Sequence, residues 1–148
     1  MTSPRLLSVL AVFCLIAIFA FAGKPDPLAE LIARADAARP EDRPAIYVEI
    51  ATHQLKAADE AYTAGKIETA RAAVNDVVTY STKAHDASIQ TAKKLKSTEI
   101  ALRKMAARLR DIQRSLSYED QPPVQAAAEQ LENLRTDLLT HMFGKAQN

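Results

Sequence analysis

The sequence predicts an all-α protein, and three observations support this prediction. The chain of 148 residues contains only three glycines, at positions 23, 65 and 144. Alanine is abundant, and no segment shows the sustained alternation of β-branched and polar residues that is typical of strands. After residue 22, prolines cluster at 25–27, 40–44 and 122–123, which leaves long stretches without a helix breaker. We expect elongated, coiled-coil-like helical hairpins that share one long central helix, with a compact four-helix bundle as the alternative.

The first 22 residues predict an export signal peptide. Arg5 is their only charged residue, an apolar run extends from Leu6 to Ala22, and Ala20 and Ala22 supply the small residues that a signal peptidase needs. We expect cleavage and a periplasmic or extracellular location, with no stable membrane insertion afterwards. The alternative is an uncleaved, membrane-tethering segment, because the apolar run lies at the short end of what spans a bilayer.

Residues 23–148 are then expected to form a single helical domain, and local signals place its first two helices. Asp26 followed by Pro27 is a good N-cap with proline in the first helical position, so one helix is expected at about 27–39. The second is expected at about 44–64 and to end at Gly65, because glycine favours the left-handed conformation that terminates helices.

The central helix is expected to run from 66 to 118, because neither glycine nor proline interrupts this stretch. Steps of three and four residues from Ile67 to Leu116 give one continuous seam, although Ser88, Thr91 and Thr98 occupy positions that a core would fill with apolar residues. A last helix is expected at about 122–143. In the compact alternative, the central helix breaks near 86–98 and the two hairpins fold together.

The two predicted turns also fix which segments face each other. Folding about Gly65 places Pro44 near His85, and folding about Asp120 places His141 near Glu99. The stretch from about 86 to 98 would then be covered by neither partner helix.

The first hairpin resembles a tetratricopeptide repeat. Tyr62 lies three residues before Gly65, Ile67 follows two residues after it, and Ala70, Val74 and Val77 continue the second helix. The resemblance covers a helix-turn-helix around residues 55–78, and no second copy of the motif is found. It implies two closely packed helices, and in that family stacked repeats form a groove for peptides.

No catalytic site is predicted, and the protein is expected not to be an enzyme. The chain lacks a nucleophile motif and a glycine-rich phosphate loop, and its single cysteine, Cys14, lies in the predicted signal. No cofactor or metal site is predicted either, since no histidine has another histidine three or four residues away; the three histidines are at 53, 85 and 141. Sugar, haem and nucleobase sites usually contain aromatic platforms, which this sequence does not suggest.

Positive charge is concentrated in one segment. Residues 91–118 contain eight Lys or Arg residues and two acidic residues, whereas residues 23–148 as a whole contain 18 of each sign. This overall balance argues against nucleic-acid binding. The cations lie off the predicted apolar seam, and the candidate partner surface consists of Lys93, Lys96, Arg103, Lys104 and Arg110.

We therefore expect an exported, non-enzymatic helical protein that acts through protein–protein interaction, as a scaffold, an adaptor or a chaperone-like module. Its partner is expected to be another protein or a second copy of the chain. The alternative is a helical bundle that binds a metal or small ligand through His141 and nearby carboxylates.

Overall fold

A computed structural model describes residues 23–144, and this part of the chain is helical without any strand. The all-α prediction is confirmed. The predicted signal peptide, residues 1–22, lies outside the described residues. None of the described helices is both long enough and apolar enough to cross a bilayer. The helices are α2 (Pro27–Ala37), α3 (Arg43–Thr63), α4 (Ile67–Thr91), α5 (Leu95–Ser115), the short 3₁₀ helix η2 (Tyr118–Asp120) and α6 (Gln121–Phe143).

Local capping signals account for the start of α2 and for the turn between α3 and α4. The Oδ1 atom of Asp26 accepts a hydrogen bond from the backbone amide of Leu28 at 3.1 Å, so Asp26 is the N-cap of α2. Gly65 has a φ of 71°, and the amide of Lys66 donates to the carbonyl of Ala61 at 2.8 Å. These are the features of a left-handed glycine cap, which ends α3 and turns the chain into α4.

The continuous helix predicted over 66–118 is wrong. Helix α4 ends at Thr91, and Ala92 and Lys94 both adopt positive φ angles, of 53° and 62°, before α5 begins at Leu95. A left-handed conformation costs a non-glycine residue about 1–2 kcal/mol. The break lets Ile89 and Leu95 pack against the hydrophobic core, and this burial offsets the cost.

The polar positions of the predicted seam mark this turn. Ser88 and Thr98 are buried, and their hydroxyl oxygens lie 2.9 Å apart in a hydrogen bond between α4 and α5. The Oγ1 atom of Thr91 accepts a hydrogen bond from the amide of Lys93 at 3.3 Å. The prediction that 86–98 is an uncovered stretch of one helix is wrong, because Ser88 and Thr98 face each other across the turn between α4 and α5.

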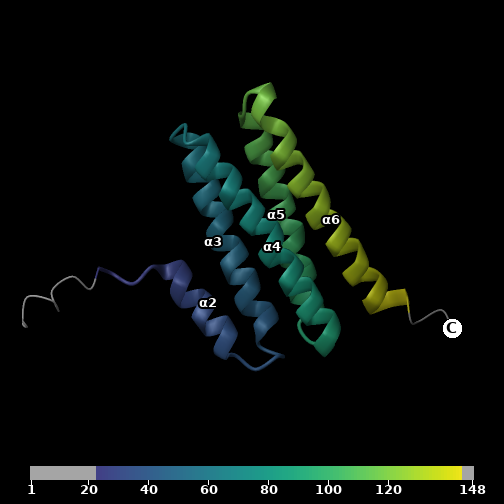
Figure 1. Cartoon of the computed structure of the whole chain (residues 1–148). Helices are drawn as coiled ribbons and strands as arrows, with labels where there is room; N and C mark the ends of the chain where they lie inside the picture. Colours follow the sequence, from purple (N-terminus) through teal and green to yellow (C-terminus); the bar gives the residue numbers. More distant parts are fainter. Residues whose placement is uncertain (1–22, 145–148) are drawn as a thin grey trace, which may run out of the picture.

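The four long helices share one core instead of forming a rod around a single helix (Figure 1). The α3–α4 hairpin packs against the α5–α6 hairpin, so that α4 lies against α6 and α3 against α5. Figure 1 shows that α3 and α5 run in the same direction, as do α4 and α6. Helix α2 packs on α3 at the edge of this arrangement.

The core combines large and small side chains. Its largest fully buried side chains include four leucines, and alanines at the helix contacts let the backbones approach closely. Each buried leucine contributes about 1.5–3 kcal/mol relative to an exposed one. The leucines are Leu102, Leu109, Leu131 and Leu138, and the fully buried alanines include Ala51, Ala58, Ala70, Ala84 and Ala106.

Candidate interaction surface

The five residues of the predicted partner surface are all exposed, but they do not share one environment. Arg110 forms an ion pair with Glu132 of α6 at 3.2 Å, and Arg103 approaches Glu99 at 4.0 Å. The other three residues, Lys93, Lys96 and Lys104, form no ion pair within residues 23–144. The structure therefore divides the predicted surface into two paired arginines near α6 and three lysines that face solvent.

Helix α6 explains why the two arginines are paired. Glu99 is buried, and its Oε1 atom accepts a hydrogen bond from Nε of Arg135 at 2.6 Å. Arg135 also lies 3.3 Å from Glu132, which joins Arg110 to the same network. The hydrogen bond to Glu99 raises the pKa of Arg135 above its already high usual value, so the guanidinium stays charged. This network joins α5 to α6 and leaves Arg103 and Arg110 less free to contact a partner.

Arg135 was not among the residues predicted from the sequence. The Nη2 atom of Arg108 lies 2.5 Å from Oδ2 of Asp59 in α3, so this arginine joins α5 to α3. His141 is exposed, and its Nδ1 atom lies 3.0 Å from the carbonyl oxygen of Asp137 in its own helix. The opposite charges of Glu99 and Arg135 were visible in the sequence, but no local pattern linked them.

Lys93 and Lys96 lie at the end of the bundle where α4 turns into α5, and Lys104 lies near the middle of α5. A fourth cation, Lys94, is exposed in the same turn and also forms no ion pair among the described residues. We call Lys93, Lys94, Lys96 and Lys104 the lysine surface. The first turn of α5 contains no acidic residue. The free amides of a helix N-terminus carry partial positive charge, so they add to the potential of the lysines instead of neutralising it.

An apolar contact point lies beside this surface. Ile100 is half-buried and follows Lys96 by four residues, which places it on the same side of α5, and it precedes Lys104 by the same interval. Helical neighbours three or four residues apart lie next to each other, so Lys96, Ile100 and Lys104 form one row. A surface of this kind suits a partner that presents negative charge next to a small apolar area.

The histidines form a separate polar contact between α4 and α6. Nε2 of His85 lies 2.7 Å from Oδ2 of Asp137, and Nδ1 of His85 lies 2.8 Å from Oδ1 of Asp86. Nδ1 of His141 is 3.4 Å from the same oxygen of Asp137. Within residues 23–144, however, no three His, Cys, Asp or Glu side chains are arranged to hold a metal ion. Of these contacts, the one between His85 and Asp137 joins α4 to α6, and the other two lie within one helix.

Three of the titratable groups in residues 23–144 have a clearly shifted pKa. Two of them are Arg39 and Arg135, which form hydrogen bonds to carboxylates. The third is Tyr62, and burial raises the pKa of its hydroxyl. Tyr62 lies in the core next to the Gly65 turn, where the charges of Arg71 and Asp120, which form an ion pair at 3.2 Å, also act on it. Comparison with protein-family models, curated proteins and solved structures found no match to this chain.

Proposed function

We propose that this chain is an exported, non-enzymatic helical protein that binds another protein through the lysine surface. It acts in the periplasm or outside the cell as a scaffold, an adaptor or a chaperone-like module. The observation that carries the proposal is the division of charge on α5. Its arginines pair with carboxylates of α3, α5 and α6, whereas the four lysines have no such partner among the described residues.

The energetics of ion pairs support this division. An exposed ion pair stabilises a fold by only about 0.2–1 kcal/mol, so leaving lysines unpaired costs the protein little. Clustered cations speed association with a partner of opposite charge and select against partners of like charge. The lysine surface thus fits a role in recognition better than a role in folding.

The resemblance of the first hairpin to a tetratricopeptide repeat supports the same class of function. The second hairpin stacks on the first with corresponding helices parallel, which is also how consecutive helical repeats stack. Proteins built in this way act by presenting surfaces to other proteins, without chemistry of their own.

Site-specific photo-crosslinking in the native cell envelope tests the proposal. A photoreactive amino acid replaces Ala107, an exposed residue that follows Lys104 by three positions on α5, and Ala72, an exposed alanine of α4, is the control site. We expect an adduct of defined mass from position 107 and none from position 72. An adduct of twice the mass of the chain would identify a second copy as the partner.

Charge-reversal variants connect this adduct to the lysines. Lys96→Glu combined with Lys104→Glu is expected to abolish the adduct, and high salt is expected to weaken it. The control combines Lys24→Glu with Lys66→Glu, which changes the net charge equally at exposed sites outside the lysine surface. Equal losses in both double variants would contradict the proposal. The mass of the N-terminus in the same preparation shows whether the predicted signal is cleaved.

The alternative function has its own test. Titration with Zn²⁺, followed by thermal unfolding, is expected to give the same result for the parent protein and for His141→Ala. A metal-dependent rise in the midpoint that the substitution removes would favour a metal-binding bundle.

A further inference from the structure

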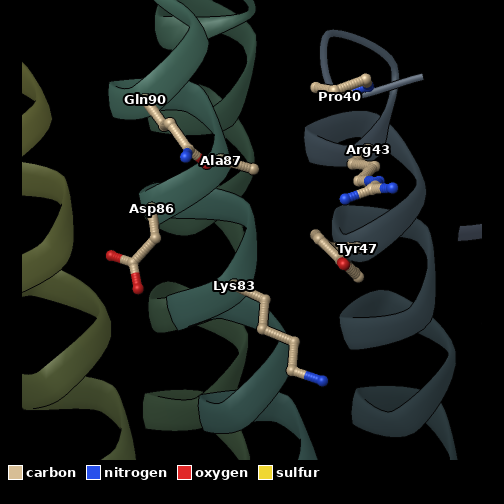
Figure 2. A pocket seen from close by; sticks show the side chains of 7 residues that line it. All are labelled: Pro40, Arg43, Tyr47, Lys83, Asp86, Ala87 and Gln90. Atoms are coloured by element: carbon tan, nitrogen blue, oxygen red, sulfur yellow. The ribbon is translucent and has the colours of Figure 1, made fainter. Parts of the chain in front are cut away.

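A small groove lies between the first turns of α3 and the last turns of α4, away from the α5–α6 network. Its walls carry Arg43 and Tyr47 from α3, and Lys83, Asp86 and Gln90 from α4 (Figure 2). Its volume is about 220 Å³. Sites for whole cofactors or drug-sized ligands usually measure roughly 300–1,000 Å³. This groove therefore has room for a single side chain or a similarly small group.

The cations of the groove have no carboxylate partner within residues 23–144. Arg43 and Lys83 form no ion pair there, although acidic residues are close by in the sequence. Glu41 and Asp42 pair instead with Arg39, at 3.4 Å and 3.0 Å. Asp86, the acidic residue of the groove, lies 2.8 Å from Nδ1 of His85. In Figure 2 its carboxylate points away from α3, so it does not face Arg43.

Both cations are held in place before any ligand arrives. Nε of Arg43 donates a hydrogen bond to the carbonyl of Ala38 at 3.1 Å. Nζ of Lys83 lies 5.9 Å from the ring centroid of Tyr47 and 5.0 Å from that of Tyr80, which are cation–π distances. Groups that are already ordered lose less conformational freedom on binding, so each contact contributes more to affinity.

The view into the groove shows how these groups would meet a ligand. Arg43 and Lys83 lie on either side of Tyr47 and come from opposite walls (Figure 2). The phenolic hydroxyl of Tyr47 is a hydrogen-bond donor between two positive charges, and the amide of Gln90 is a further donor. This set of donors matches a carboxylate, which only accepts hydrogen bonds.

We propose that the groove binds the carboxylate side chain of an acidic segment in the protein partner. This inference rests on the proposed function, because it names the chemistry of the partner. The small volume fits one Glu or Asp side chain. Gln90 lies on the last turn of α4, and Lys93 and Lys94 follow within one turn's length, so an acidic segment that leaves the groove meets the lysine surface next.

Binding of defined peptides to the full-length protein in mild detergent tests this inference. The probe is fluorescent octaglutamate at low salt, and octaglutamine of the same length is the uncharged control. We expect saturable binding of octaglutamate only, with nuclear magnetic resonance shifts at the amides of Arg43, Tyr47, Lys83 and Gln90.

Two variants assign the binding to the groove. Lys83→Gln is expected to weaken octaglutamate binding by up to about fivefold, which is the effect of one exposed ion pair. Lys66→Gln, at the opposite end of α4, removes the same charge and is expected to leave the affinity almost unchanged. Arg43→Gln is expected to act like Lys83→Gln, and its thermal unfolding midpoint shows whether the contact with Ala38 matters for folding.

Three results would overturn the inference. Equal losses of affinity for Lys83→Gln and Lys66→Gln would mean that octaglutamate binding depends only on the overall charge of the protein. Shifts confined to the lysine surface would place the acidic segment elsewhere. Glutarate that binds as tightly as octaglutamate would mean that the groove takes a free small carboxylate. The photo-crosslinking at Ala107 reports on the proposed function independently, so this inference can fail while the proposed function stands.

Discussion

Two serines of α4 test how a buried hydroxyl group affects stability with and without a hydrogen-bond partner. Ser81 and Ser88 are both fully buried, seven residues apart on the same side of the helix. The hydroxyl of Ser88 is hydrogen-bonded to Thr98 at 2.9 Å, whereas the Oγ atom of Ser81 has no hydrogen-bond partner among the described residues. The same substitution by alanine should therefore change stability in opposite directions.

The magnitudes follow from the two environments. Ser88→Ala leaves the buried hydroxyl of Thr98 without a partner, which costs about 1–3 kcal/mol. Ser81→Ala removes a hydroxyl that is buried without compensation, and we expect it to stabilise the protein by about 1 kcal/mol. Alanine also favours helix over serine by a few tenths of a kcal/mol, about equally at both sites. The free energies of unfolding of the two variants should thus differ by about 2–4 kcal/mol.

Urea unfolding, followed by circular dichroism, measures this difference as a change in the free energy of unfolding. A double-mutant cycle with Thr98→Val adds a second test, because valine keeps the shape of threonine and removes its hydroxyl. We expect the Ser88→Ala, Thr98→Val protein to lose less stability than the sum of the single variants, by about 1 kcal/mol. Equal effects of Ser81→Ala and Ser88→Ala, or additive effects in the cycle, would refute the reasoning.

Three further predictions concern the turn, the core and the alkaline limit of stability. Gly65→Ala should lower the free energy of unfolding in urea by about 1–2 kcal/mol, because φ at Gly65 is 71°. Steric overlap does not add to this cost, since nothing lies within 4 Å of a Cβ added at Gly65. Gly144→Ala is the control and should have little effect, because φ at Gly144 is negative. Leu109→Ala should lower the free energy of unfolding by about 2–5 kcal/mol, because Leu109 is fully buried. Leu139 is half-buried, so Leu139→Ala should lower it less. Burial raises the pKa of the Tyr62 hydroxyl, so this hydroxyl loses its proton at a lower pH in the unfolded state than in the folded state. The stability of the unsubstituted protein should therefore fall as the pH rises above about 10. Tyr62→Phe should lack this part of the decline in urea titrations across pH, and an unchanged decline would contradict the assignment.

Most helix boundaries could be predicted because their signals are local. Asp26, Gly65 and the prolines at 122–123 act on backbone groups within a few residues, so their effects appear in the sequence itself. The antiparallel hairpin about Gly65 could be predicted for the same reason. Pro44 was expected near His85, and the groove indeed joins Arg43 and Tyr47 to Asp86.

The break between α4 and α5 could not be predicted from local signals, because it contains neither glycine nor proline. Ala92 and Lys94 adopt a conformation that their own preferences disfavour. The polar seam at Ser88 and Thr98 was compatible with a continuous helix, and only the compact alternative placed a break near 86–98, where the structure has it.

For the candidate site, too, some features could be predicted from the sequence and others could not. The exposure of the five predicted cations followed from their positions off the apolar seam, and it is confirmed. Which of them are paired depended on the contact between α5 and α6, and the pairing of Glu99 with Arg135 joins residues that are far apart in the chain. The groove, too, depends on side chains from two helices, and no sequence pattern marked it.

By itself, the sequence determined that this protein is helical, where its strongest caps lie, and that one segment is rich in positive charge. These properties depend on composition and on interactions within one or two helical turns. Where the central segment breaks, and which of its cations pair with carboxylates, follows from the packing of the two hairpins. The reason is physical: burial of Ile89 and Leu95 in a shared core offsets the cost of two left-handed residues, and that burial exists only once the two hairpins pack together.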